Sequence, residues 1–182
     1  QYGALTALIQ ASAIKLFGER LIVIRFLTAL FYGLISVLLW LIYSRFLPKW
    51  LNTLSCLIWL FLGYFFINLP AMFILPWATV LAVFAILLSL YFLILFLEKQ
   101  NYFFLFIIGM SSSLALWLKI NYGVISFLSM FLLLISLNIY NKKNIPNILL
   151  TFLSGYFFIN AIFLLWLAVN GAIADLISQS LK

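Results

Sequence analysis

Charged residues are so rare in this chain that they divide it into long uncharged windows. Lys and Arg together number 10, and Asp and Glu number 3, among 182 residues. The windows between them are 26–44, 50–97, 100–118, 120–141 and 144–174. A helix that crosses the hydrocarbon core of a bilayer needs about 20 apolar residues. Because charged residues make up 7% of this chain and about 25% of a typical soluble domain, the sequence predicts a polytopic membrane protein.

The window 50–97 is too long for one helix, and it contains Pro70 and Pro76. Each proline removes a backbone donor and clashes with the preceding turn, so we expect two helices here. Closed barrels alternate apolar and polar residues, and these windows do not. We therefore predict an all-α membrane helix bundle of about six transmembrane helices, preceded by a short interfacial helix. The predicted spans are 26–44, 51–69, 77–97, 101–118, 121–139 and 147–169.

Three segments follow from these spans. Residues 1–25 form an extracytoplasmic interfacial segment, with a weakly amphipathic helix near 4–16 that ends at Gly18. Residues 26–169 form the transmembrane bundle. Residues 170–182 form an extracytoplasmic tail that we expect to be truncated. The chain starts without a methionine or a signal peptide, and we expect it to be a fragment of a longer protein.

The positive charges between the predicted spans favour one orientation. The connections on one side carry five of them: Arg45, Lys49, Lys99, Lys142 and Lys143. The connections on the other side carry Lys119 alone, so the positive-inside rule places the first side in the cytoplasm. The flanking segments weaken this difference, because they add four cations to the opposite side: Lys15, Arg20, Arg25 and Lys182. Aromatic residues near span ends, such as Trp117 and Tyr122, are typical of interfacial belts.

Few residues in the chain can bind a metal or act as acids and bases. Histidine is absent, and Cys56 is the single cysteine, which argues against an intrachain disulfide and a thiolate metal site. The acids are Glu19, Glu98 and Asp175, too few for a metal cage or a paired-carboxylate site within this chain. We expect no metal, no cofactor and no nucleic-acid partner. The net charge of +7 favours contact with anionic lipid headgroups or phosphates.

Lys119 interrupts an otherwise uncharged stretch from Gln100 to Asn141. A lysine in hydrocarbon costs about 3 kcal/mol on insertion scales, so it marks a membrane surface or a functional site. The predicted spans place Lys119 in a tight turn at the extracytoplasmic surface, where its stem can snorkel. Two interpretations stay open: an interfacial anchor, or an ammonium that faces a lipid headgroup or a phosphate. Gly123 nearby would permit close approach of a backbone or a ligand.

Several stretches of the chain resemble one known family. They are QYGAL at 1–5, KLFGER at 15–20 followed by Arg25, IIGMSSSLALWLKINYG at 107–123 and NGAIADLISQS at 170–180. In this order they are similar to GT-C superfamily glycosyltransferases, and in particular to mannosyltransferase-like bacterial membrane proteins that use polyprenyl-phosphate sugars. The resemblance covers most of the chain in layout and is specific in residues 1–25 and 109–123. One departure is Ala4, where relatives commonly have proline.

The resemblance implies a function and a location. These enzymes transfer a sugar from a polyprenyl-phosphate donor to an acceptor on the extracytoplasmic face of a bacterial inner or plasma membrane. The implied partners are thus a polyprenyl-phosphate-linked sugar and membrane lipid. The catalytic aspartate of the family falls upstream of Gln1, which leaves no catalytic residue in this chain. Arg25 and Lys119 would contact the carrier phosphate, and Tyr2 would line the acceptor cleft, although a helix-end anchor is the simpler role for Arg25.

A membrane transporter is the main alternative from another class. Asn68, Pro70 and Pro76 could form the broken helix near the bilayer midplane that such proteins use, but coupled carriers normally place acids or histidines within their spans. A non-catalytic membrane subunit or lipid-binding scaffold fits the composition equally well. Gly109 and serines 111–113 would be small residues that let helices pack closely, which is also their simplest role in an enzyme.

Overall fold

The computed structural model describes residues 3–19, 21–68, 77–141 and 145–172, most of which are α-helical. The helices of this described part are α1 (Ala4–Phe17), α2 (Leu21–Tyr43), α3 (Lys49–Asn68), α4 (Trp77–Lys99), α5 (Tyr102–Leu118), α6 (Ile120–Asn141) and α7 (Ile145–Val169). Tyr2, Pro70, Pro76 and the tail from residue 173 lie outside it. The expectations for those residues therefore stay predictions.

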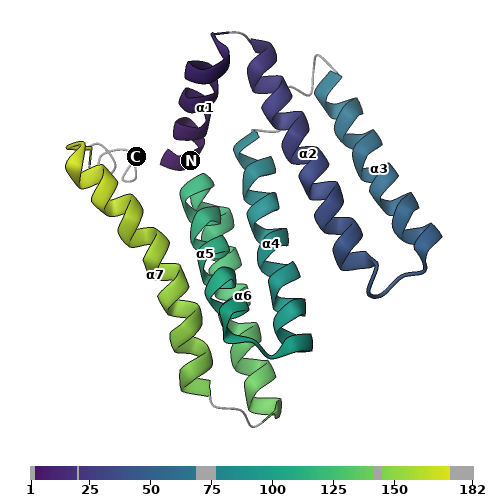
Figure 1. Ribbon diagram of the computed structural model, residues 1–182, viewed down its shortest axis with the longest axis vertical. Helices are drawn as coiled ribbons and strands as arrows, with labels where there is room; N and C mark the ends of the chain where they lie inside the picture. The colour runs from purple at the N-terminus through teal and green to yellow at the C-terminus, as the bar shows by residue number, and fades with distance from the viewer. Residues whose placement is uncertain (1–2, 20, 69–76, 142–144, 173–182) are drawn as a thin grey trace.

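Helices α2 to α7 run alternately in opposite directions through the bundle (Figure 1), as short connections between neighbouring helices require. α2, α4 and α6 begin at one end, which we call the Lys119 end, and finish at the other, which we call the Arg45 end. α5 contacts α1, α4, α6 and α7, whereas α3 packs mainly against α2 at the edge. α1 stands at the Lys119 end, packed against α2 and α5.

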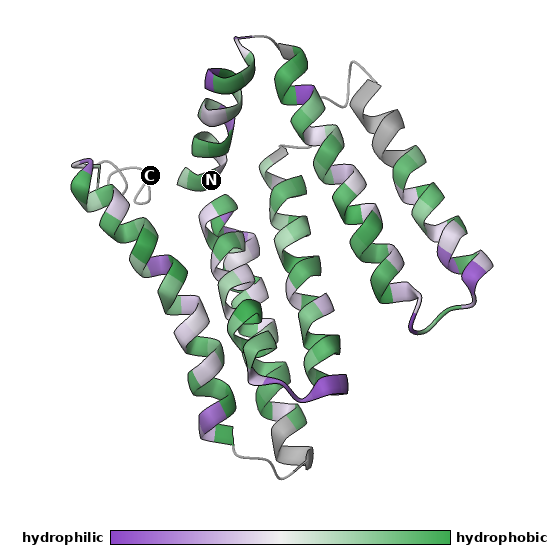
Figure 2. Cartoon of the chain, viewed as in Figure 1, coloured by the Kyte–Doolittle hydropathy of each residue, from purple (hydrophilic) through white to green (hydrophobic). Residues whose placement is uncertain are grey.

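Several helices have the length and composition of membrane spans. Four qualify within the described residues: Ile22–Tyr43, Ala78–Lys99, Ile120–Leu137 and Ile145–Val169. Apolar residues cover the helices over most of their length, and the connection between α4 and α5 is strongly hydrophilic (Figure 2). Large apolar side chains such as Phe61 and Leu165 are about two-thirds exposed, and contiguous surfaces of this kind are rare in soluble monomers. The predicted all-α, multi-pass membrane bundle is confirmed.

The predicted helix boundaries agree with the structure to within two residues, except at the start of α2. α2 begins at Leu21 instead of residue 26, because the apolar run from Leu21 to Ile24 extends the helix and Arg25 is exposed on its surface. α1 ends at Phe17 and is capped by Gly18, whose φ of 90° favours glycine. α5 has 17 residues and is about 25 Å long, shorter than a hydrocarbon core of about 30 Å. The total of six spans stays a prediction.

Two glycines allow α5 and α7 to pack backbone against backbone. A Cβ atom on Gly109 would lie 2.1 Å from the carbonyl oxygen of Phe152, and a Cβ atom on Gly155 would lie 2.0 Å from that of Phe106. No side chain fits at either position without a shift of the backbone. Small residues at such crossings let membrane helices gain close van der Waals contact, and Gly109 has the packing role that we considered for it.

A ladder of hydrogen bonds joins α3 to α2. Each rung is a donation from an α3 side chain to an α2 backbone carbonyl: Asn52 Nδ2 to Trp40 at 3.0 Å, Cys56 Sγ to Ser36 at 3.5 Å and Trp59 Nε1 to Tyr32 at 3.3 Å. The donors lie one helical turn apart and therefore on one face of α3. Each polar group thus finds a partner inside the bundle, where water is scarce.

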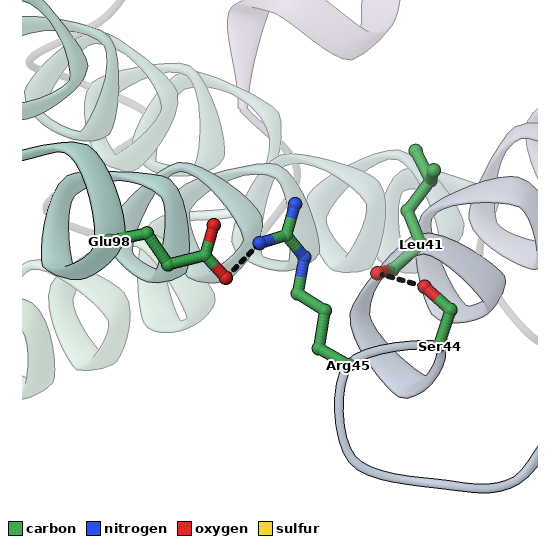
Figure 3. Close-up of polar contacts among 4 residues, drawn as sticks. All are labelled: Leu41, Ser44, Arg45 and Glu98. Carbon is green, nitrogen blue, oxygen red and sulfur yellow. Dashed lines mark hydrogen bonds and ion pairs between the residues drawn. The ribbon is translucent and has the colours of Figure 1, made fainter.

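At the Arg45 end, an ion pair connects the α2–α3 turn to α4 (Figure 3). The Arg45 guanidinium donates to the Glu98 carboxylate and lies 5.7 Å from the centroid of the Tyr91 ring. The hydrogen bond with Glu98 raises the pKa of Arg45. In the same view, the Ser44 hydroxyl donates to the Leu41 carbonyl and closes the last turn of α2. Both charged groups are partly exposed, so the pair contributes less than about 1 kcal/mol.

Candidate anion site at Lys119

Lys119 is the single residue between α5 and α6. Its backbone is extended, with φ of −155° and ψ of 111°. Its N–H donates to the Ala115 carbonyl at 2.9 Å, and its own carbonyl accepts from the Gly123 N–H at 3.0 Å. A Cβ atom on Gly123 would lie 2.1 Å from the Cα of Leu116. Gly123 therefore permits close approach of the α5 backbone, and the chain reverses direction at Lys119.

The Lys119 side chain is held by α4 and α6. Its Nζ donates to Thr79 Oγ1 at 2.9 Å and lies 4.5 Å from the centroid of the Tyr122 ring. Thr79 is in the first turn of α4 and is buried, with 8% of its surface exposed. The lysine is itself half-buried. An ammonium with one hydrogen bond and one aromatic face beside it has a fixed position, unlike a lysine that snorkels freely into water.

α1 completes the surroundings of the α5–α6 turn. The Gly3 N–H and the Thr6 hydroxyl both donate to the Leu118 carbonyl, at 3.0 and 2.9 Å. A Cβ atom on Gly3 would lie 1.8 Å from the Trp117 carbonyl oxygen, so a glycine is needed here. The last carbonyls of a helix have no partner within that helix. α1 supplies two donors to one of those carbonyls and brings its own N-terminus to this place.

Three helix N-termini thus meet at the Lys119 ammonium or beside it. α6 begins directly after Lys119, α4 begins just before Thr79, and the start of α1 is bonded to Leu118. Each helix N-terminus carries about half a positive charge. α5 presents its negative end here, where α1 donors occupy the Leu118 carbonyl, and α7 also ends near the start of α1. Positive charge accumulates at this point, and such a place favours an anion.

The described acids do not neutralise this charge. Glu98 is paired with Arg45 at the opposite end of the bundle, and Glu19 is exposed in the connection between α1 and α2. Among the residues that the structure describes, no carboxylate forms an ion pair with Lys119. An anion brought from outside would therefore meet the positive charge without competition from these acids.

The three predicted site residues, Lys119, Arg25 and Tyr2, do not come together in one described site. Lys119 has defined partners. Arg25 lies exposed near the start of α2, the helix that begins at the Lys119 end, and is not among the residues that hold the Lys119 ammonium. Tyr2 lies outside the described residues. Phosphate contact by Arg25 and a cleft role for Tyr2 stay predictions.

The sequence analysis missed Thr79, Thr6 and the contact of Tyr122 with Lys119, and it misjudged the role of Trp117. Tyr122 lies three residues after Lys119, in the first turn of α6, and this closeness in sequence was an available signal. Thr79 could be identified as a partner of Lys119 only from the packing of α4 against α5, which the sequence does not show. Trp117 is a correction: its side chain is 8% exposed and donates to Asn160 Oδ1 of α7 at 3.0 Å, so it joins two helices instead of belonging to an interfacial belt.

A comparison of the chain with protein-family models, curated proteins and solved structures found no match. The resemblance to GT-C glycosyltransferases therefore rests on the residue patterns themselves. The site contributes separate information, because its chemistry follows from the positions of Lys119, Thr79 and Tyr122 and from the helix ends around them.

Proposed function

We propose that the chain belongs to an integral-membrane glycosyltransferase that moves a sugar from a polyprenyl-phosphate donor to an acceptor on the extracytoplasmic face. The observation that supports this best is the half-buried Lys119 ammonium, placed where α1, α4 and α6 begin. A phosphate is the anion that helix N-termini and lysine commonly bind together. The residue patterns at 1–25 and 109–123 support the same function.

The chemistry needs a fixed cation near the phosphate. In the transfer, an acceptor oxygen bonds to the anomeric carbon, and the bond from that carbon to the phosphate oxygen breaks. The electron pair leaves with the phosphate, so negative charge grows there, and a cation already in place stabilises the transition state. The proton of the acceptor hydroxyl goes to a carboxylate base. We assign that base to no residue of this chain and give Lys119 the role of binding the phosphate.

The location of Lys119 suits a donor that is itself a lipid. A polyprenyl chain stays in the hydrocarbon and holds its phosphate at the membrane boundary. Lys119 lies in a turn at one end of a bundle with apolar helix surfaces (Figure 2). The carrier phosphate and the ammonium can therefore meet at the same depth. A non-catalytic subunit that binds a lipid phosphate would use the same residue, and product formation separates these two functions.

The test is sugar transfer by the complete protein in proteoliposomes, at a donor concentration below KM. We expect Lys119→Met to lower the initial rate by at least about tenfold, and Lys119→Arg to retain more activity because it keeps the charge. Lys49→Met, which removes an exposed cation at the Arg45 end, is the matched control. If Lys119→Met transferred sugar at the wild-type rate, at equal protein abundance, the assignment of the phosphate site to Lys119 would be wrong. Donor binding without any glycosyl product would favour the non-catalytic subunit, and uptake or efflux without product would favour a transporter.

A further inference from the structure

The Lys119 side chain is directed toward two helix N-termini, although it is long enough to point away from them. Its ammonium lies beside Thr79 in the first turn of α4 and Tyr122 in the first turn of α6. The positive ends of helices disfavour a cation. A lysine that served only as an interfacial anchor would extend its flexible stem into the headgroup region. The negative end of α5, which Lys119 caps, offsets part of this cost, and the observed position requires further compensation.

Thr79, on α4, and Tyr122, on α6, provide that compensation. The Thr79 oxygen accepts one ammonium N–H at 2.9 Å, across 40 positions of the sequence. The Tyr122 ring lies 4.5 Å from Nζ, within the range of a cation–π interaction. Thr79 itself is buried, so its oxygen has little access to water as an alternative partner. Neither residue carries a negative charge, and the pair holds the ammonium without neutralising it.

We infer that Thr79 and Tyr122 are positioning residues that hold the Lys119 ammonium ready for the phosphate of a lipid. The inference rests on the proposed function for the identity of the ligand. A carboxylate in place of Thr79 would satisfy the lysine and cancel its charge. A neutral oxygen and an aromatic face leave the full charge for an incoming anion, which then also interacts with the N-termini of α4 and α6.

The test compares variants that keep or remove each contact. Thr79→Val removes the oxygen at nearly constant volume and Thr79→Ser keeps it, whereas Tyr122→Leu removes the ring and Tyr122→Phe keeps it. Affinity is measured on the complete protein in detergent with undecaprenyl phosphate, and with undecaprenol as the uncharged control. We expect Thr79→Val and Tyr122→Leu to raise Kd by about fivefold to tenfold. Thr79→Ser and Tyr122→Phe should stay within about twofold, and binding of undecaprenol should not change.

The ligand source is resolved by two further probes, inorganic phosphate and phosphatidylglycerol in mixed micelles. If neither probe displaces undecaprenyl phosphate, the result supports a site that is specific for the polyprenyl-phosphate carrier. Displacement by phosphatidylglycerol at equal concentration overturns the assignment to the carrier, and displacement by millimolar inorganic phosphate shows that the lipid tail does not matter, which also overturns it.

A second measurement uses the unaltered protein, in case a variant does not fold. The rate at which an amine-reactive reagent labels Lys119 should fall when undecaprenyl phosphate is added and not when undecaprenol is added. Equal labelling in both conditions contradicts the inference. Wild-type affinity in Thr79→Val and Tyr122→Leu, with binding lost in Lys119→Met, would overturn the positioning roles and leave the proposed function intact. Tight binding of undecaprenyl phosphate, with the expected rise in Kd in Thr79→Val and Tyr122→Leu but no glycosyl product, would overturn the proposed function alone.

Discussion

The Lys119 ammonium donates a 2.9 Å hydrogen bond to Thr79 Oγ1, which lies 40 residues earlier in the chain. This contact ties the turn between α5 and α6 to the first turn of α4. It places the one cation of the α5–α6 turn among helix N-termini and beside the Tyr122 ring. The proposed phosphate site depends on this arrangement, whereas the stability of the bundle depends on contacts elsewhere.

Gly155→Ala should destabilise the bundle because the added methyl would lie 2.0 Å from the Phe106 carbonyl oxygen. We expect a loss of about 1–3 kcal/mol in the free energy of unfolding, measured by denaturant titration in mixed micelles. Gly33→Ala is the matched control, because a Cβ atom there meets nothing within 4 Å and alanine favours helix. Equal stability of the two variants would show that α5 and α7 do not pack as described.

Asn52→Ala should weaken the attachment of α3 to α2. Asn52 is 1% exposed and donates to the Trp40 carbonyl at 3.0 Å, and interhelical bonds of this kind are worth about 0.6–2 kcal/mol in membranes. The same unfolding titration measures the effect. Ser55→Ala is the control, because the Ser55 hydroxyl bonds to Leu51 within its own helix. A loss in Ser55→Ala as large as in Asn52→Ala would contradict the ladder.

The contribution of the Arg45–Glu98 pair should not depend on pH between 7 and 10. The hydrogen bond with Glu98 raises the pKa of Arg45 above its ordinary value, so the folded protein holds this proton more tightly than the unfolded chain does. Stability from a raised pKa is fully present below the unfolded pKa and is lost as pH rises through the folded pKa, and for an arginine both lie well above pH 10. Wild type and Arg45→Gln should differ in the free energy of unfolding by the same small amount, less than about 1 kcal/mol, at pH 7 and at pH 10. A difference that vanishes by pH 10 would be inconsistent with this assignment.

Ser113→Ala and Ser126→Ala should leave stability unchanged or raise it slightly. Their hydroxyls are buried, and within the described residues neither has a hydrogen-bond partner. Replacing an unsatisfied buried hydroxyl with a methyl group removes a desolvation cost of about 1–3 kcal/mol, which offsets the small change in packing. Thermal unfolding of the two variants in detergent is the measurement. A loss of more than about 1 kcal/mol in either one would show that its hydroxyl makes a bond that this structure does not contain.

The membrane fold could be predicted from the sequence because charge is excluded from hydrocarbon. Charged residues marked most of the predicted helix ends, and prolines marked the division between α3 and α4; nearly every predicted boundary agrees with the structure to within two residues. The exception, the start of α2, shows the limit of that rule, since Arg25 is exposed within a helix that continues past it. Hydropathy identifies where a helix can lie in a membrane and does not fix its first turn.

The site was only partly predictable. Lys119 was conspicuous because it interrupts an apolar stretch, and its position in a tight turn followed from the spans on either side. Its contact with Thr79 depends on how α4 packs against α5, and no local pattern encodes that. Trp117 was misassigned for the same reason: an aromatic residue near a helix end can face lipid or a neighbouring helix, and only packing decides.

The central claim is that the Lys119 ammonium binds a lipid phosphate. Phosphorus NMR of undecaprenyl phosphate in nanodiscs tests it most directly, with the complete protein present as wild type or as Lys119→Met. We predict that the phosphorus resonance shifts in proportion to wild-type protein and stays at its free position with Lys119→Met. The same shift with both proteins would contradict the claim.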